Sequence, residues 1–234
     1  MSAIFWKEVK SYFYSPIAYI LIGFFTLLTS LFFTPNLVNR NGDFTGVLSN
    51  MGFFLVFIIP VLTMRILAED RKNGTEVMLI TSPASITSIV LGKFLASYVV
   101  FLVITVISFI YPLSMLAFGG QITTALVGGY IGFLLLGAAF ISVGVFASSL
   151  TENQVVAVVI GFVCLLIMWV ADGLGSVLGG LWAKVLAWFS LISRYDDFSK
   201  GILGLSPVVY YLSFVAVFLF VTIRVIEKRR WSQG

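Results

Sequence analysis

The sequence predicts an all-α membrane protein with six transmembrane helices. Of its 234 residues, 60% are hydrophobic and 10% are charged, whereas soluble domains carry about 25% charged residues. Such a chain cannot cover a globular surface with polar groups, which excludes a soluble enzyme, a nucleic-acid-binding domain and a disordered tail. The chain also contains uncharged stretches long enough to cross a bilayer, for which a helix needs about 20 apolar residues.

The N-terminal residues 2–14 predict a short helix that lies in the plane of the membrane interface. Its apolar residues recur at helical spacing, at Phe5, Val9, Tyr12 and Phe13. Its charged residues fall off this stripe, at Lys7, Glu8 and Lys10. The side chains expected to characterise this interfacial helix are Phe5, Trp6, Lys7 and Lys10. Pro16 then starts the first span, because proline is tolerated in the first turn of a helix.

Six apolar stretches predict the spans, which together form a single transmembrane domain over residues 1–234. We expect the spans at residues 16–38, 46–67, 91–117, 125–149, 154–172 and 206–226. The third and fourth come from one uncharged stretch, 94–151, that would extend roughly 87 Å as a single helix. It must therefore fold back, and Gly119-Gly120-Gln121 is the obvious turn.

The distribution of Lys and Arg predicts that both termini are cytoplasmic. When the N-terminus is placed inside, only four of the 14 basic residues fall in outer segments, at Arg40, Lys184, Arg194 and Lys200. Cytoplasmic loops carry the excess of Lys and Arg in multi-pass membrane proteins. The positive net charge of +4 therefore reflects topology rather than a basic surface for nucleic acid.

The first inner loop, residues 67–93, concentrates charge. Its charged residues include Glu69, Asp70, Arg71, Lys72 and Glu76. Gly74 can end one helix. Thr75 can cap the next, over residues 76–80, until Pro83 ends it. Such a short helix projecting from the membrane is suited to docking a partner, and the alternative is a charged cap that only keeps the second span from sliding.

The second inner loop, residues 148–154, is very short. Thr151 and Glu152, with the two residues after them, can cap the first turn of the fifth span. Anionic groups are favourable at that position because they face the positive end of the helix dipole. A structural role is the simpler interpretation of this loop.

The longest outer segment, residues 173–205, predicts an amphipathic helix at the other interface. After a glycine-rich start, apolar residues share one helical face: Leu181, Val185, Trp188, Phe189 and Ile192. A polar group follows, with Arg194, Asp196, Asp197 and Lys200. Two adjacent acids without further ligands are a weak signal for Ca²⁺, so we expect a solvated turn with internal ion pairs.

Glycines in the fourth span form a small-residue face at Gly128, Gly132, Gly137 and Gly144. Small residues let helix backbones approach closely in membranes. The face is suited to packing within the chain or between two chains.

The sequence lacks the residues of a catalytic or metal-binding site, and we expect no enzyme activity and no bound cofactor. It contains no His and one cysteine, Cys164, which removes the commonest metal ligand and acid–base group. Gly92-Lys93 is nearest to a phosphate-binding loop, but Thr87 occupies the position of its first glycine. The ionisable residues closest to the spans should lie at span ends and snorkel, namely Arg65, Lys93, Asp172 and Arg224.

A series of segments carries a family resemblance: Lys7-Glu8-Val9-Lys10-Ser11-Tyr12-Phe13, Ser15-Pro16, Met64-Arg65, Gly74-Thr75-Glu76, Thr81-Ser82-Pro83 and Leu91-Gly92-Lys93. Together they resemble the permease subunit of bacterial ABC-2-type transporters. Three later segments resemble the gliding-motility (Gld-type) branch of these permeases: Ser148–Gln154, Tyr210-Tyr211-Leu212 and Glu227-Lys228-Arg229-Arg230. The similarity covers nearly the whole chain.

The resemblance implies a permease of the bacterial inner membrane that is driven by a separate cytoplasmic ABC ATPase, which would bind the ATP and Mg²⁺. Two permease chains, identical or related, would pair in one complex. The first inner loop would then hold a cytoplasmic coupling helix. The coupling residues carried over are Glu69, Asp70, Arg71, Gly74, Thr75, Glu76, Pro83, Thr151 and Glu152. The outer amphipathic segment would match the short extracellular helices that cap the translocation path in this family.

The mechanism that the resemblance implies is alternating access, in which closure of the ATPase pair pushes residues 75–80 and tilts the first two spans relative to those of the second permease chain. The alternative is a membrane scaffold of an ATPase-driven envelope or gliding-motility machine. A Na⁺-coupled carrier with broken helices also stays open. A proton-coupled carrier is disfavoured because we expect no ionisable residue deep in the spans. An apolar interior fits lipids, lipid-linked glycans, peptides and hydrophobic drugs alike.

Overall fold

The computed structural model describes residues 1–38, 44–82, 84–117, 123–178, 180, 190–202 and 204–232. All regular secondary structure in these residues is helical. Six segments are long and apolar enough to cross a membrane: Pro16–Val38, Thr45–Lys72, Ile86–Ala117, Thr124–Leu150, Gln154–Ala171 and Leu205–Arg229. The predicted all-α membrane fold with six spans is therefore confirmed.

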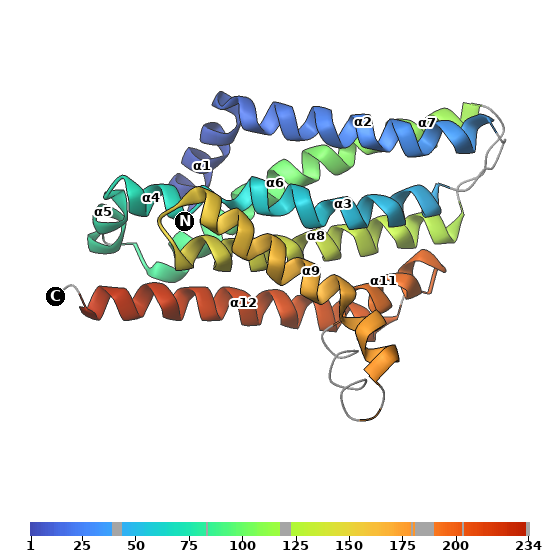
Figure 1. The fold of residues 1–234 in the computed structure, drawn as a ribbon. Helices are drawn as coiled ribbons and strands as arrows, with labels where there is room; N and C mark the ends of the chain where they lie inside the picture. Colours follow the sequence, from blue (N-terminus) through green and yellow to red (C-terminus); the bar gives the residue numbers. More distant parts are fainter. Residues whose placement is uncertain are drawn as a thin grey trace.

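The helices form one bundle with two distinct ends. The long helices are α2 (Pro16–Val38), α3 (Thr45–Thr63), α6 (Ile86–Ser108), α8 (Thr124–Leu150), α9 (Gln154–Leu178) and α12 (Leu205–Ser232). The shorter ones are α1 (Ser2–Tyr14), α4 (Ala68–Lys72), α5 (Thr75–Thr81), α7 (Ile110–Ala117) and α11 (Ile192–Ser199). Figure 1 shows α1, α4, α5 and both termini at one end of the bundle, which we call the charged end, and α7 and α11 toward the opposite end.

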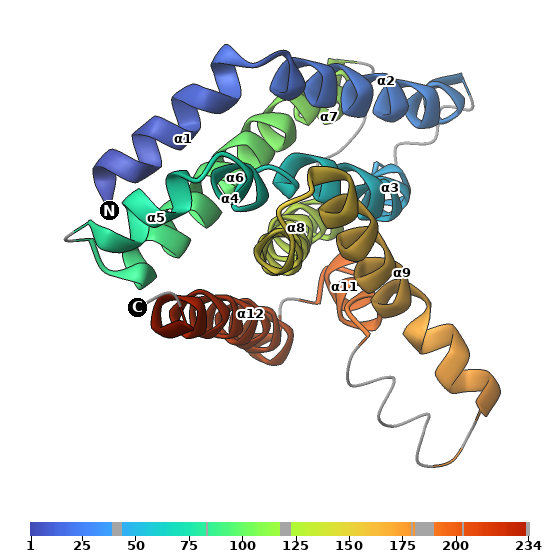
Figure 2. The ribbon, with the colours of Figure 1, turned by 60° about the vertical axis from the view of Figure 1, so that its left-hand side comes forward.

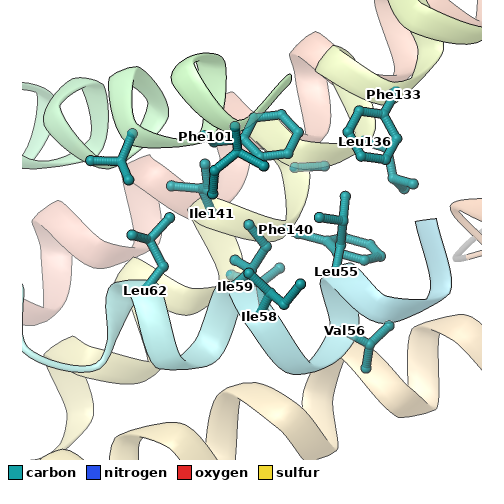
Figure 3. Packing of buried hydrophobic residues seen from close by; sticks show 14 of the residues in the cluster. Leu55, Val56, Ile58, Ile59, Leu62, Phe101, Phe133, Leu136, Phe140 and Ile141 are labelled. Carbon is teal, nitrogen blue, oxygen red and sulfur yellow. The ribbon is translucent and has the colours of Figure 1, made fainter. Parts of the chain in front are cut away.

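Helix α8 is the centre of the bundle. It contacts α3, α6, α9, α11 and α12, which surround it in Figure 2. Figure 3 shows the core where α8 meets α3 and α6, formed by Leu55, Ile59, Leu62, Phe101, Phe133, Leu136, Phe140 and Ile141. These side chains are fully buried. Because lipid is as apolar as a protein core, close packing rather than exclusion of water holds such helices together.

Glycines of α8 permit this close packing. A Cβ atom on Gly132 would lie 2.7 Å from the Cβ of Phe198 on α11. A Cβ atom on Gly137 would overlap the ring of Phe101, and one on Gly144 would overlap Thr63. These three positions of the predicted small-residue face therefore pack within the chain.

The second predicted span, residues 46–67, is shorter as a continuous helix. Helix α3 ends at Thr63, and a turn separates it from α4. The turn is held by Ser148 of α8, whose hydroxyl donates to the carbonyl of Met64 at 3.0 Å. A contact with a residue far along the chain therefore sets this helix end.

The third predicted span, residues 91–117, is broken near its outer end. Helix α6 begins earlier, at Ile86, and ends at Ser108 before α7. Pro112 has no N–H to donate to the carbonyl of Ser108, so the regular helical bond is missing there. The hydroxyl of Tyr130 on α8 donates to that carbonyl instead, at 3.2 Å.

Helices α9 and α12 extend beyond residues 172 and 226, the predicted ends of the fifth and sixth spans, although the apolar spanning part of α9 ends at Ala171, next to the predicted end. Helix α9 runs to Leu178, so the beginning of the predicted outer segment is helical. Helix α12 continues to Ser232 at the charged end. Most of the predicted amphipathic face, residues 181–189, lies outside the described residues.

Candidate functional site

A polar cavity of about 230 Å³ lies at the charged end, between α1, α4, α6 and the turn that follows α3. Its ionisable lining residues are Lys7, Glu8, Tyr12, Arg65, Glu69, Asp70 and Lys93. The acidic and basic groups among them balance, so the cavity has no net charge to attract a free ion. The charged side chains instead join the helices around the cavity.

Lys93 lies inside α6 with 1% of its side chain exposed. Its Nζ is 2.7 Å from a carboxylate oxygen of Glu8 on α1 and 2.5 Å from one of Asp70 on α4. It also donates to the carbonyl of Ile66 at 2.7 Å. The prediction that Lys93 snorkels from a span end is wrong, because protein acceptors replace water around its ammonium group.

Helices α4 and α5 are joined at Gly74, whose φ of +71° lies in the left-handed region that favours glycine. Thr75 is the first residue of α5 and does not cap it, so that prediction is wrong. Its hydroxyl donates to Asp70 at 2.9 Å instead. Asp70 therefore binds Thr75 with one carboxylate oxygen and Lys93 with the other.

Ser148 near the end of α8 fixes the start of α4. Its hydroxyl oxygen accepts hydrogen bonds from the backbone N–H groups of Leu67 and Ala68, each at 3.1 Å. These are orphan donors of the first turn of α4, which a residue from another helix satisfies here. Ser148 is 1% exposed, so water does not compete at this position.

The two predicted inner loops lie side by side. The guanidinium of Arg71 is 3.9 Å from the carboxylate of Glu152 and donates to the carbonyl of Leu150 at 3.5 Å. Of the four residues predicted to cap the fifth span, Asn153 caps α9, since its side chain accepts from the N–H of Val155 at 2.9 Å. The hydroxyl of Thr151 accepts from the N–H of Asn153 at 3.1 Å.

Arg229 of α12 joins the same region from the other side. Its guanidinium lies 3.4 Å from the carboxylate of Glu76 on α5 and also donates to the carbonyl of Ser149. Carbonyls at a helix C-terminus accept favourably from cationic side chains. Glu76 is thus held within the chain by Arg229.

Helix α1 is anchored to the bundle by Tyr12 and Arg65. The buried hydroxyl of Tyr12 donates to the carbonyl of Leu62 at 2.8 Å. Burial raises the pKa of this phenol above its ordinary value, so it stays a donor. Arg65 lies 5.5 Å from the centre of the Tyr12 ring and donates to Ser11 and Ser15. Arg65 therefore turns toward α1 rather than snorkelling to water as predicted.

The predicted anchor residues of α1 lie on its outer side. Trp6, Lys7 and Lys10 are exposed, and Phe5 is half-buried with its ring edge-to-face against Trp6. Glu8 was expected to lie off the packing face, but it points into the bundle, where Lys93 binds it.

The surface of the first inner loop combines charged and apolar side chains. The carboxylate of Glu69 is partly exposed and lies 3.8 Å from the guanidinium of Arg65 one turn away. Val77 and Met78 on α5 are 53% and 76% exposed. Pro83, the last predicted coupling residue of this loop, lies outside the described residues.

The sequence analysis missed four residues of this site: Glu8, Lys93, Ser148 and Arg229. Lys93 had a readable signal, since it is a lysine that directly precedes a long uncharged stretch. Its partners on α1 and α4 had none, because they are distant in sequence.

The opposite end has a different polar group on α11. The residues expected in a solvated turn lie on this helix, where Arg194 stacks on the ring of Tyr210, 5.2 Å from its centre. Asp196 and Asp197 were predicted to pair with Arg194 or Lys200. Arg194 instead contacts the ring of Tyr210. In the described part of the chain, no group of three or more acidic or sulfur ligands is arranged to hold a metal.

Comparison with known families decides the class of the protein. The family model described as ABC-2 family transporter protein matches residues 35–223. The chain belongs to this family. No curated protein matches it. The family match runs from the end of α2 into α12, so it includes both inner loops. This ABC-2 protein is therefore the membrane-embedded permease component of an ABC transporter, and membership implies partnership with an ABC ATPase.

Proposed function

We propose that the charged end of this ABC-2 permease docks a cytoplasmic ATPase subunit and that ATP hydrolysis there drives a substrate across the membrane by alternating access. The observation that carries this proposal is the family match over residues 35–223. The predicted coupling residues of both inner loops meet at one end of the bundle, which supports a single docking surface there.

The docking surface is centred on α5 and the adjoining exposed side chains. Val77 and Met78 present apolar groups at the same end of the bundle as the carboxylates of Glu69 and Glu152, whose side chains are 44% and 67% exposed. Apolar side chains rimmed by charged ones are typical of protein interfaces. Asp70 and two other coupling candidates of this loop, Thr75 and Glu76, bind within the chain. We assign these three to holding the loop in place rather than to contact with the ATPase.

The charged end is placed in the cytoplasm by the positive-inside rule. Basic residues of this end come from α1, the α3–α5 region and α12: Lys7, Lys10, Arg65, Arg71, Lys72, Arg224, Lys228 and Arg229. Both termini are then cytoplasmic, in the inner membrane of a bacterium. ATP and Mg²⁺ bind to the ATPase partner in this proposal.

A second permease chain, identical or related, completes the complex in this proposal. Assignment to the Gld-type branch rests on the sequence segments at residues 148–154, 210–212 and 227–230, and stays a prediction. Under the scaffold alternative, the complex would hydrolyse ATP but would move no substrate. A transport assay of the energised, reconstituted complex with candidate lipids and peptides separates the two.

The docking surface is tested by affinity purification of the tagged chain in mild detergent, followed by mass spectrometry. The wild-type chain is expected to retain a P-loop ATPase in near-equal amount. The double variant V77E/M78E should lose at least about tenfold of that ATPase, because two charges would be desolvated in the interface. The matched control is Ile202→Glu, an equally exposed apolar position at the opposite end. Equal ATPase recovery with V77E/M78E and wild type would place the docking surface elsewhere.

A further inference from the structure

We propose that Lys93 is a positioning residue that makes α1, α4, α5 and α6 move as one unit, so that a displacement of α5 by the ATPase reaches α1 and α6. The role of the ATPase in this statement rests on the proposed function above. The unit is built on four side chains, which we call the Lys93 cluster: Glu8, Asp70, Thr75 and Lys93. Each comes from a different helix.

Hydrogen bonds and one ion pair join the cluster. Lys93 donates to Glu8 and to the carbonyl of Ile66, each at 2.7 Å, and its ammonium group forms an ion pair with a carboxylate oxygen of Asp70. The second oxygen of Asp70 accepts from Thr75 at 2.9 Å. Hydrogen bonds between ionised groups at these distances are short and directional. A continuous path of bonds therefore runs from α5 through α4 to α6 and α1.

The charges of the cluster are balanced only while the helices stay together. Lys7 lies 3.8 Å from Glu8, so two cations face two carboxylates. If α1 moved away from α4, Lys93 would lose one of its two carboxylate partners in a buried place. Such a state is costly because the ammonium is out of contact with water. The cluster therefore opposes separation of these helices.

The backbone beside Lys93 is shaped for the same contact. A Cβ atom on Gly92 would lie 3.3 Å from the side chain of Ile4 and 3.5 Å from the backbone nitrogen of Phe5. The absence of a side chain at Gly92 lets α1 lie directly against α6. This close approach keeps Glu8 within reach of Lys93.

The path gives the ATPase a direct mechanical connection to the membrane-spanning part. The exposed Met78 lies on α5 near Thr75, and Thr75 is the first member of the path. Coupling between distant sites requires a contiguous physical network whose parts move together. The Lys93 cluster is that network here, and α1 is a part of it rather than a separate interfacial anchor.

The test measures the distance between α1 and α4 in the full-length chain in lipid nanodiscs. Nitroxide labels are placed by Ala3→Cys and Lys72→Cys, two exposed positions, in a Cys164→Ala background. The wild-type distance distribution is expected to be narrow. Lys93→Met leaves two carboxylates facing each other and should widen the distribution by about twofold or more. The matched control Lys200→Met, an exposed lysine at the opposite end, should leave it unchanged.

A second variant keeps the test decisive if Lys93→Met does not fold. Glu8→Gln retains the Lys93–Asp70 pair and weakens only the link to α1. It should widen the same distribution while the chain stays monodisperse in gel filtration. The proposal is overturned if folded Lys93→Met gives the same distance distribution as the wild type. If Lys93→Met does not fold, the same result in Glu8→Gln overturns it.

The same labelled pair then tests transmission in the complex with the co-purified ATPase. Trapping with ATP and vanadate should leave the wild-type distance unchanged, because α1 and α4 move together. In Lys93→Met the ATPase should still bind, but trapping should change the distance, since α4 then moves without α1. A nucleotide-dependent distance in the wild type refutes the single unit. If no ATPase co-purifies with the wild type, the proposed function fails, while the measurement without nucleotide still decides whether the cluster joins the helices.

Discussion

The substitution Ser148→Ala tests how α8 holds the first inner loop. It removes one hydroxyl group that accepts from the N–H groups of Leu67 and Ala68 and donates to the carbonyl of Met64. The site is buried, and alanine fits it without a new contact. The variant therefore isolates the hydrogen bonds from packing.

The expected cost follows from the two N–H donors left without a partner. An unsatisfied buried donor costs about 1–3 kcal/mol. Because both donors share a single acceptor, their losses do not add in full, and we expect about 2–4 kcal/mol for local opening of the start of α4. Since 1.4 kcal/mol is a factor of ten, the amides of Leu67 and Ala68 should exchange roughly 30-fold to several hundred-fold faster than in the wild type.

Hydrogen exchange followed by mass spectrometry in nanodiscs measures this change. The matched control is Ser149→Ala, whose hydroxyl donates only to Phe146 in its own helix. That variant should leave the amides of Leu67 and Ala68 protected. The role of Ser148 as the cap of α4 would be refuted if these amides exchanged in Ser148→Ala at the wild-type rate. It would also be refuted if both variants accelerated their exchange equally.

Two further predictions concern packing and charge. Gly132→Ala should lower the stability of the purified chain by about 1–3 kcal/mol, because its Cβ would lie 2.7 Å from Phe198. The control Gly23→Ala has open space around it and should be neutral or stabilise the chain by roughly 0.5–1 kcal/mol. Equal unfolding temperatures for the two variants would contradict the packing role of Gly132. Glu76→Arg should release α5 from α12 by repelling Arg229, and the exchanged pair Glu76→Arg with Arg229→Glu should restore the contact with a coupling energy of about 1 kcal/mol. Disulfide trapping between cysteines on α5 and α12 measures the second effect, and no recovery in the exchanged pair would show that the ion pair does not hold α5.

The positions of the spans could be predicted because each depends on a local property. A continuous apolar stretch must cross the membrane as a helix, since the bilayer offers no partners for an open backbone. The ends of the helices could not be predicted in the same way. The break after Thr63 depends on Ser148, and the break before α7 depends on Pro112 together with Tyr130. Only the proline is visible in the local sequence.

The candidate site was predicted in part. The first inner loop was identified by its charge, and Asp70 and Thr75 do lie at its centre. From the sequence, Lys93 was expected to extend its ammonium group into water, because basic residues at span ends usually snorkel. Helical periodicity identified the apolar face of α1 but not that Glu8 borders it closely enough to reach Lys93. A pair separated by 85 positions leaves no local trace in a single sequence.

The internal bonds of the first inner loop change the motion expected on ATP binding. A tilt of the first two spans relative to the rest of their own chain would pull the end of α3 from Ser148 and α4 from Lys93. Both contacts are buried, so their loss would leave unsatisfied donors and charges. Movement of the loop together with α6, α8 and α12 breaks neither contact. The change between the two access states then occurs where fewer internal contacts oppose it.

The outer spans are suited to accommodate that change. Only 28% of the spanning part of α2 and 22% of that of α9 is buried within the chain, against 72% for α8. Much of the surface of α2 and α9 therefore faces lipid or a second chain. An ATPase shifts the equilibrium between two states only through contacts that differ between them. If the ATPase contacts only the inner loops, and the Lys93 cluster holds α1, α4, α5 and α6 together, the differing contacts must lie between whole permease chains.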